Sequence, residues 1–174
     1  MILNIIEEIK TKETNNIWIG STFECIRNLQ IDKRGSVGER FFQRVFTFSE
    51  FSRRIEYKDG DQGDWDLKVN NIRLEVKTSS IDVNKKFQNE GIRKTEKTYD
   101  GILFLGIAPE NIFFKIIKYS EIPFDKLHCR EKAKTGVGYK WDFKEHQMLK
   151  FSSFDFDENI QSVISEFKKV FSLK

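Results

Sequence analysis

Asp66 and Glu75 have the spacing of a cation-binding pair of carboxylates. The segments 66–69 and 72–77 alternate apolar and polar residues, and Asn70-Asn71 lies between them. Asparagine tolerates positive φ, so this pattern predicts a hairpin with a two-residue turn. In that register Asp66 directly opposes Glu75, with Cβ atoms about 4.5–5.5 Å apart. Like charges so placed repel each other unless a cation lies between them.

Mg²⁺ would suit this pair, because it binds carboxylate, carbonyl, water and phosphate oxygens. The backbone carbonyl of Val76 could add a third protein ligand, and a phosphodiester could complete the coordination shell. Lys77 follows Glu75 by two residues and therefore shares its face of the strand. Its side chain could orient or deprotonate a water and stabilise charge on a phosphate. Exposed acidic and basic pairs without any catalytic role are also common on hairpins, and this alternative stays open.

The elements that must position these residues begin with helices. Periodic apolar residues predict one helix over residues 2–12 and a short one over 21–29. Ser36 and Glu39 have the spacing of a capping box ahead of an apolar stripe, so we expect a third helix to begin at Ser36. A last helix is expected from Asp157 onward, because apolar residues recur there at helical spacing.

The remaining pattern indicates a sheet. The continuously apolar segment 102–108 predicts a strand buried on both faces, at the centre of the sheet. Further strands are expected at 112–117 and at 139–143, and in the second of these three aromatic side chains should face the core. The segment 58–63 is expected to be a loop, and the segment 85–97 a loop or a short helix. The order of elements predicts a single α/β (α+β) domain over residues 1–174, with a mixed β-sheet flanked by helices.

At this point the sequence resembles the PD-(D/E)XK nuclease superfamily, and within it the type II restriction endonucleases. The resemblance rests on Gly63-Asp-Trp-Asp-Leu67 and Leu74-Glu-Val-Lys-Thr-Ser79, with Gly38-Glu39 upstream and Tyr99-Asp-Gly-Ile-Leu-Phe-Leu-Gly-Ile107 downstream. It spans roughly residues 36–122, about half of the chain. It implies the mixed sheet of restriction endonucleases, with the catalytic core in this segment.

The resemblance also implies roles for individual residues. By position, Asp66 and Glu75 become the metal-binding carboxylates, Lys77 the catalytic lysine, and Glu39 an auxiliary acid that can join the metal site. For Glu39 the capping box with Ser36 offers a structural role as well, and the two roles are compatible.

The register of the first acid has one alternative. Trp65 stands where the family name has proline, so Asp64 is a second candidate for the position of Asp66. Strand pairing favours Asp66, because Asp64 would face Lys77 rather than Glu75 on the same ladder. A bulge would change this assignment.

The implied function is a Mg²⁺-dependent endonuclease that hydrolyses double-stranded DNA, with a homodimer matching a palindromic site. One alternative is a structure-specific or repair nuclease such as a Holliday junction resolvase, since that group shares the pattern. Another is a DNA-binding module of the same fold without catalytic activity.

Two basic segments are candidates for DNA contacts. The segment 85–97 carries Gln88, Asn89 and Arg93, which could reach phosphates or base edges. The segment 130–139 carries Lys134 and Thr135 next to glycines. A solvated basic loop and a hairpin turn, respectively, are the plain alternatives.

Composition excludes several other classes. The chain has 174 residues, of which 39% are hydrophobic and 14% aromatic, enough for a folded core. Its net charge of +3 permits a polyanionic partner. Cys25 and Cys129 form no C-x-x-C pair and are expected to be buried thiols, and neither histidine lies in a metal-binding motif. Since no apolar run or export signal stands out, we expect a cytoplasmic protein without a membrane partner.

Overall fold

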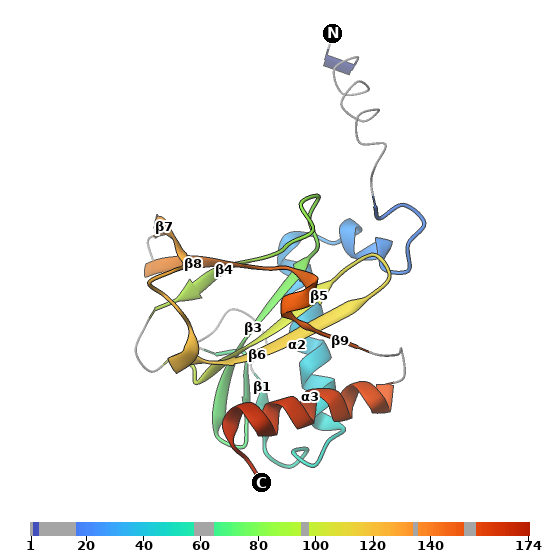
Figure 1. The fold of residues 1–174 in the computed structure, drawn as a ribbon. Coiled ribbons are helices and arrows are strands. Elements are labelled where there is room, and N and C mark those ends of the chain that lie inside the picture. The colour runs from blue at the N-terminus through green and yellow to red at the C-terminus, as the bar shows by residue number, and fades with distance from the viewer. Residues whose placement is uncertain (1, 4–16, 58–64, 95–97, 134–135, 152–155) are drawn as a thin grey trace.

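The computed structural model describes residues 2–3, 17–57, 65–94, 98–133, 136–151 and 156–174 (Figure 1). Most of the helix predicted at 2–12 and the loop predicted at 58–63 lie outside these residues. The described elements are the α-helices α2 (Ile31–Thr47) and α3 (Phe156–Phe171), the 3₁₀ helices η1 (Glu24–Asn28), η2 (Tyr119–Glu121) and η3 (Glu145–Gln147), and the strands β1 (Ile55–Tyr57), β2 (Leu67–Val69), β3 (Ile72–Ser80), β4 (Phe87–Arg93), β5 (Gly101–Ile107), β6 (Ile112–Lys118), β7 (His128–Ala133), β8 (Gly136–Phe143) and β9 (Leu149–Lys150).

The strands form two sheets. The larger one has six strands in the order β1-β2-β3-β5-β6-β9, and the smaller one has three in the order β4-β8-β7. Only the pairing of β3 with β5 is parallel among the strand pairs described; the others are antiparallel. The predicted α+β class with a mixed sheet is therefore confirmed.

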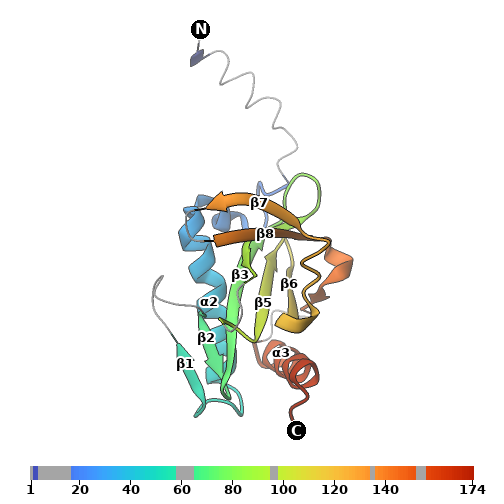
Figure 2. The same cartoon turned by 90° about the vertical axis from the view of Figure 1, so that its left-hand side faces the viewer.

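Three layers result from this arrangement. The helices α2 and α3 cover one face of the larger sheet and contact each other, with the rings of Phe46 and Phe167 5.0 Å apart. The smaller sheet covers the opposite face, where Phe104 of β5 packs against Trp141 and Phe143 of β8. Figure 2 shows β7 and β8 crossing the strands of the larger sheet near one end. The prediction of a sheet flanked by helices is thus confirmed, and both α-helices described lie on the same face of it.

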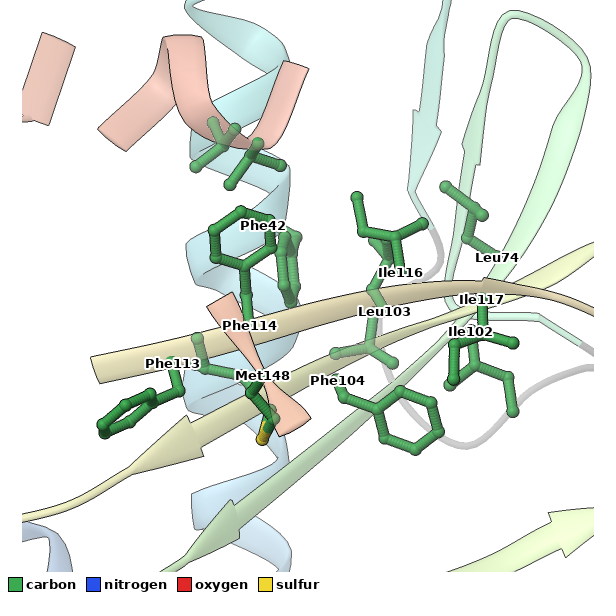
Figure 3. Packing of buried hydrophobic residues seen from close by; sticks show 14 of the residues in the cluster. Phe42, Leu74, Ile102, Leu103, Phe104, Phe113, Phe114, Ile116, Ile117 and Met148 are labelled. Atoms are coloured by element: carbon green, nitrogen blue, oxygen red, sulfur yellow. The ribbon is translucent and has the colours of Figure 1, made fainter. Parts of the chain in front are cut away.

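The strand β5 is the centre of the core, as its apolar run predicts. All seven of its residues are buried, between β3 on one side and β6 on the other. Figure 3 shows side chains of β5 and β6 together with Phe42 of α2. The expected inner face of α3 is confirmed by the burial of Ile160, Val163 and Phe167.

The N-cap of helix α2 lies six residues before the position that the capping box predicts. This N-cap is Gln30, and Ser36 lies inside the helix, where its hydroxyl donates to the carbonyl of Asp32 at 3.4 Å. A serine in a helix interior often bonds back to the preceding turn in this way. The capping role that the spacing assigns to Ser36 and Glu39 is therefore wrong, whereas the apolar stripe that follows is buried as expected.

The smaller sheet contains the main element that the sequence pattern misses. Residues 87–93 form β4 rather than a loop or short helix, because they pair with β8 far along the chain. Strand pairing of this kind depends on tertiary contacts more than on local propensity. The expectation of buried thiols is also wrong, since Cys25 and Cys129 are both exposed. None of the described helices is long and apolar enough to cross a bilayer.

Candidate active site

The predicted hairpin forms in the predicted register. Leu67 pairs with Leu74 and Val69 with Ile72. The turn residues Asn70 and Asn71 have φ values of 51° and 67°, which is the left-handed conformation that a two-residue turn requires. The strands on both sides of this turn carry the candidate catalytic residues.

Asp66 leaves the regular ladder just before β2. Its backbone N–H donates to the carbonyl of Leu74 at 3.0 Å, and its Oδ2 accepts the backbone N–H of Val76 at 2.7 Å. The backbone N–H of Val76 in β3 is thus bonded to the side chain of Asp66 instead of to a backbone carbonyl of the neighbouring strand. Asp64, the alternative acid, lies outside the described residues.

Glu75 and Lys77 lie on the face of β3 that is turned toward the smaller sheet. Successive side chains of a strand alternate between its faces, and Thr78 and Val76 lie against Gly38 of α2 on the other face. Glu75 is only 5% exposed, and its Oε1 is 2.7 Å from Lys77 Nζ. The predicted acid and lysine are therefore brought together at a buried position.

Burial raises the pKa of Asp66 to about 6, and the negative charge of Glu75 is the second cause. The hydrogen bond from Val76 opposes this rise, Glu39 adds to it, and Lys77 lowers the pKa slightly. The structure therefore brings both predicted metal-binding carboxylates and the predicted lysine into one electrostatic cluster. A proton or another cation stabilises Asp66 in these surroundings.

Glu39 reaches this cluster from α2. Its Oε2 accepts the hydroxyl of Tyr57 at 3.5 Å, and its charge acts on the pKa of Asp66. Glu39 therefore belongs to the same electrostatic cluster, and the role of auxiliary acid that the resemblance implies stays a prediction. Tyr57 is a residue of the site that the sequence did not indicate, since a tyrosine in a three-residue strand carries no distinguishing signal.

The ligands available for a metal are two carboxylates and a carbonyl. In a strand the N–H and C=O groups of one residue point to the same side, so the carbonyl of Val76 points toward Asp66, to which its N–H is bonded. Among the described residues no group of three or more His, Cys, Asp or Glu side chains could hold a metal ion. Mg²⁺ often uses only one or two carboxylates and keeps several waters, so Asp66, Glu75 and Val76 fit this ion better than they fit zinc.

The strand β4 passes over Lys77. A bulge interrupts its pairing with β8 between Asn89 and Ile92, and Gly91 within this bulge has φ +68°. A Cβ at Gly91 would lie 3.8 Å from Lys77 Nζ. The bulge is followed by Arg93, whose Nη2 is 3.6 Å from Glu75 Oε2.

The residues predicted to contact DNA have different surroundings. Gln88 is exposed and bonded to Asp82 and to Lys140 of β8. Asn89 is 3% exposed, and its amide donates to the carbonyls of Phe87 and Trp141, so the structure does not support the base contact predicted for it. Lys134 and Thr135 lie outside the described residues.

No protein-family model matches the chain, and no curated protein matches it. One similar solved structure is that of a bacterial homing endonuclease, with 11% sequence identity and a TM-score of 0.42, over 80% of this chain and 98% of the other. A likeness of this degree does not establish a shared function.

Proposed function

We propose that the protein is a Mg²⁺-dependent endonuclease that cleaves double-stranded DNA, and more narrowly a type II restriction endonuclease. The observation that carries the proposal is the 2.7 Å ion pair between Lys77 and the buried carboxylate of Glu75, next to Asp66 with its raised pKa. Burying charges is costly to folding. Perturbed ionisable groups in mutual contact are therefore typical of functional sites.

The residues have distinct roles in this reaction. Asp66, Glu75 and the carbonyl of Val76 would hold the ion, and Mg²⁺ bound there would polarise a phosphate oxygen. Lys77 is held beside Glu75 by an ion pair, so its ammonium group acts by donating hydrogen bonds to the attacking water or to a phosphate oxygen. Glu39 adds negative charge that favours binding of a cation.

The partner and assembly follow from the same proposal. Once a divalent cation is bound to the carboxylates, a DNA phosphate would be an anionic partner for that cation and for Lys77. Cleavage of both strands at a palindromic site calls for a two-fold homodimer with one site for each strand. Gln88, which is exposed on the smaller sheet, remains a candidate for contact with a base or phosphate.

Digestion of plasmid and linear duplex DNA by the purified protein tests the proposal. We expect discrete fragments with Mg²⁺, binding without cleavage with Ca²⁺, and loss of cleavage in Asp66→Ala, Glu75→Ala and Lys77→Met. Glu145→Ala, which removes an exposed carboxylate of η3, is the matched control and should cut normally.

Other outcomes would overturn the proposal in different ways. Cleavage confined to branched DNA would replace the restriction enzyme with a structure-specific nuclease such as a junction resolvase. Binding of DNA without cleavage under any divalent cation would indicate a module without catalytic activity. Equal cleavage by wild type and by Glu75→Ala would place the active site elsewhere.

A further inference from the structure

Arg93 joins the candidate active site from the smaller sheet. Its Nη2 is 3.6 Å from Glu75 Oε2, while Lys77 Nζ is 2.7 Å from the other oxygen, Oε1. One buried carboxylate is thus shared by two cations. An ionised carboxylate that is 5% exposed needs such partners, since burying an unpaired charge destabilises the folded state.

Of the two cations, Arg93 is held less tightly by Glu75. The Arg93 side chain is 38% exposed, compared with 21% for Lys77, and its contact is longer. The backbone of Arg93 is held in place, because its carbonyl accepts a hydrogen bond from the hydroxyl of Tyr99 at 2.8 Å and because Arg93 pairs with Gly138 of β8. The guanidinium group can therefore change partners without movement of the strand.

The charges of the cluster show when such a change would occur. Asp66, Glu75 and Glu39 provide three carboxylates, and Lys77 and Arg93 provide two cations, so the ionised cluster has one negative charge in excess. A divalent cation would convert this into one positive charge in excess. A phosphodiester, with its single negative charge, would then restore neutrality.

We propose that Arg93 has two alternative partners, the carboxylate of Glu75 in the metal-free protein and a phosphate oxygen of DNA when a divalent cation is bound. The inference rests on the proposed nuclease function and adds the residue that couples cation binding to phosphate binding. A forked guanidinium suits both partners, since it bonds carboxylates and phosphates in the same geometry.

This coupling predicts effects of opposite sign from one substitution. In Arg93→Met the competitor for Glu75 is lost, so the protein without DNA should bind Mg²⁺ about tenfold more tightly at pH 8. Isothermal titration with Mg²⁺ alone measures this. The same variant should bind duplex DNA about tenfold more weakly in Ca²⁺ and cut it more slowly in Mg²⁺, because a phosphate partner is missing.

Two further variants make the test specific. Arg93→Lys keeps the charge and should retain the Mg²⁺ affinity of the wild type. Arg53→Met removes an exposed arginine between α2 and β1 and should change neither affinity. If Arg93→Met does not fold, Arg93→Gln takes its place, with folding checked by thermal unfolding.

The outcomes separate this inference from the function on which it rests. Weaker DNA binding in Arg93→Met with unchanged Mg²⁺ affinity would make Arg93 an ordinary phosphate contact and overturn the exchange. Weaker Mg²⁺ binding would also overturn it, because Arg93 would then support the metal site rather than compete for it. A wild-type protein that neither binds Mg²⁺ nor cuts DNA would overturn both proposals.

Discussion

Val76 donates its backbone N–H to Oδ2 of Asp66 at 2.7 Å. Val76 lies between Glu75 and Lys77 on β3, so this one bond attaches the carboxylate of Asp66 to the strand that carries the other two groups. The mutual placement of the candidate catalytic residues is therefore fixed within a single hairpin.

The raised pKa of Asp66 predicts that the metal-free protein loses stability as the pH rises. Its folded-state pKa is about 6 and its ordinary value is 3.8, so between these values the folded state binds the proton more tightly than the unfolded state does. Asp66→Asn keeps an oxygen acceptor for Val76 and removes the charge. It should stabilise the protein at pH 7.5 by about 1–3 kcal/mol.

Urea unfolding in the presence of EDTA checks this prediction at pH 4.5 and pH 7.5. The difference in free energy of unfolding between variant and wild type should be small at the lower pH and clear at the higher one. A variant less stable than wild type at pH 7.5 would show that the charge of Asp66 is not unfavourable in the folded protein.

Gly38 should be necessary for the packing of α2 on β3. A Cβ at Gly38 would overlap Oγ1 of Thr78, so Gly38→Ala must displace the Thr78 side chain or separate α2 from β3, and it should cost about 1–3 kcal/mol. Gly35 is the matched control in the same helix, because a Cβ there meets nothing within 4 Å. Gly35→Ala should stabilise the protein by roughly 0.5–1 kcal/mol.

Chemical unfolding of both variants measures these opposite changes. Thr78→Ala combined with Gly38→Ala should recover part of the loss, since the overlapping hydroxyl is gone. Equal stability of the two single variants would mean that α2 does not pack as closely on β3 as the structure indicates.

The pair Asp100 and Arg73 should contribute stability that is lost in acid. The carboxylate of Asp100 accepts two hydrogen bonds from the Arg73 guanidinium, at 3.1 and 2.9 Å, and one from its backbone N–H at 2.8 Å. These bonds to Arg73 lower the pKa of Asp100 below 3.8. The stabilisation is therefore present above the unfolded-state pKa and lost as the pH falls through the folded-state value.

Asp100→Asn should cost about 1 kcal/mol at pH 7, since both side chains are partly exposed and solvent screens the pair. Thermal unfolding between pH 2.5 and 7 follows the effect, which should shrink toward the acid end. Asp125→Asn, at an exposed position, provides the control. A loss that stayed constant down to pH 2.5 would contradict an electrostatic origin.

Asn89 should matter for stability and not for DNA binding. Its buried amide links β4 to β8 through the carbonyl of Trp141, so Asn89→Ala should cost about 1–3 kcal/mol. Gln88→Ala, on the exposed face of the same strand, should leave the melting temperature nearly unchanged. Thermal unfolding and DNA binding in Ca²⁺ distinguish the two, and a larger loss of affinity in folded Asn89→Ala than in Gln88→Ala would contradict this division.

Local chemistry explains which parts of the molecule the sequence predicts. The pair Asn70-Asn71 predicts the hairpin and its register, because asparagine tolerates the left-handed conformation that both turn residues adopt. The apolar run of β5 and the stripe of α3 are likewise readable from spacing. The start of α2 cannot be predicted in this way, because a serine followed three residues later by a glutamate occurs inside helices as well as at their ends.

Distant pairing explains what the sequence does not predict. The segment 87–93 is polar and irregular, and only its pairing with β8 makes it a strand. The contact of Arg93 with Glu75 requires that strand and its bulge, so spacing along the chain gave no sign of it. The basic character of this segment suggests contact with DNA, but nothing in its spacing indicates contact with Glu75.

The turn at Asn70-Asn71 also keeps the candidate catalytic residues on one short segment of the chain. Asp66, Glu75 and Lys77 belong to one continuous stretch of twelve residues, 66–77, so their meeting requires only a very short loop closure. The helices and β5 supply the surrounding rigidity rather than the meeting itself. The hairpin therefore determines which of these groups meet, whereas the burial of Glu75 and its contact with Arg93 depend on the strands packed around it.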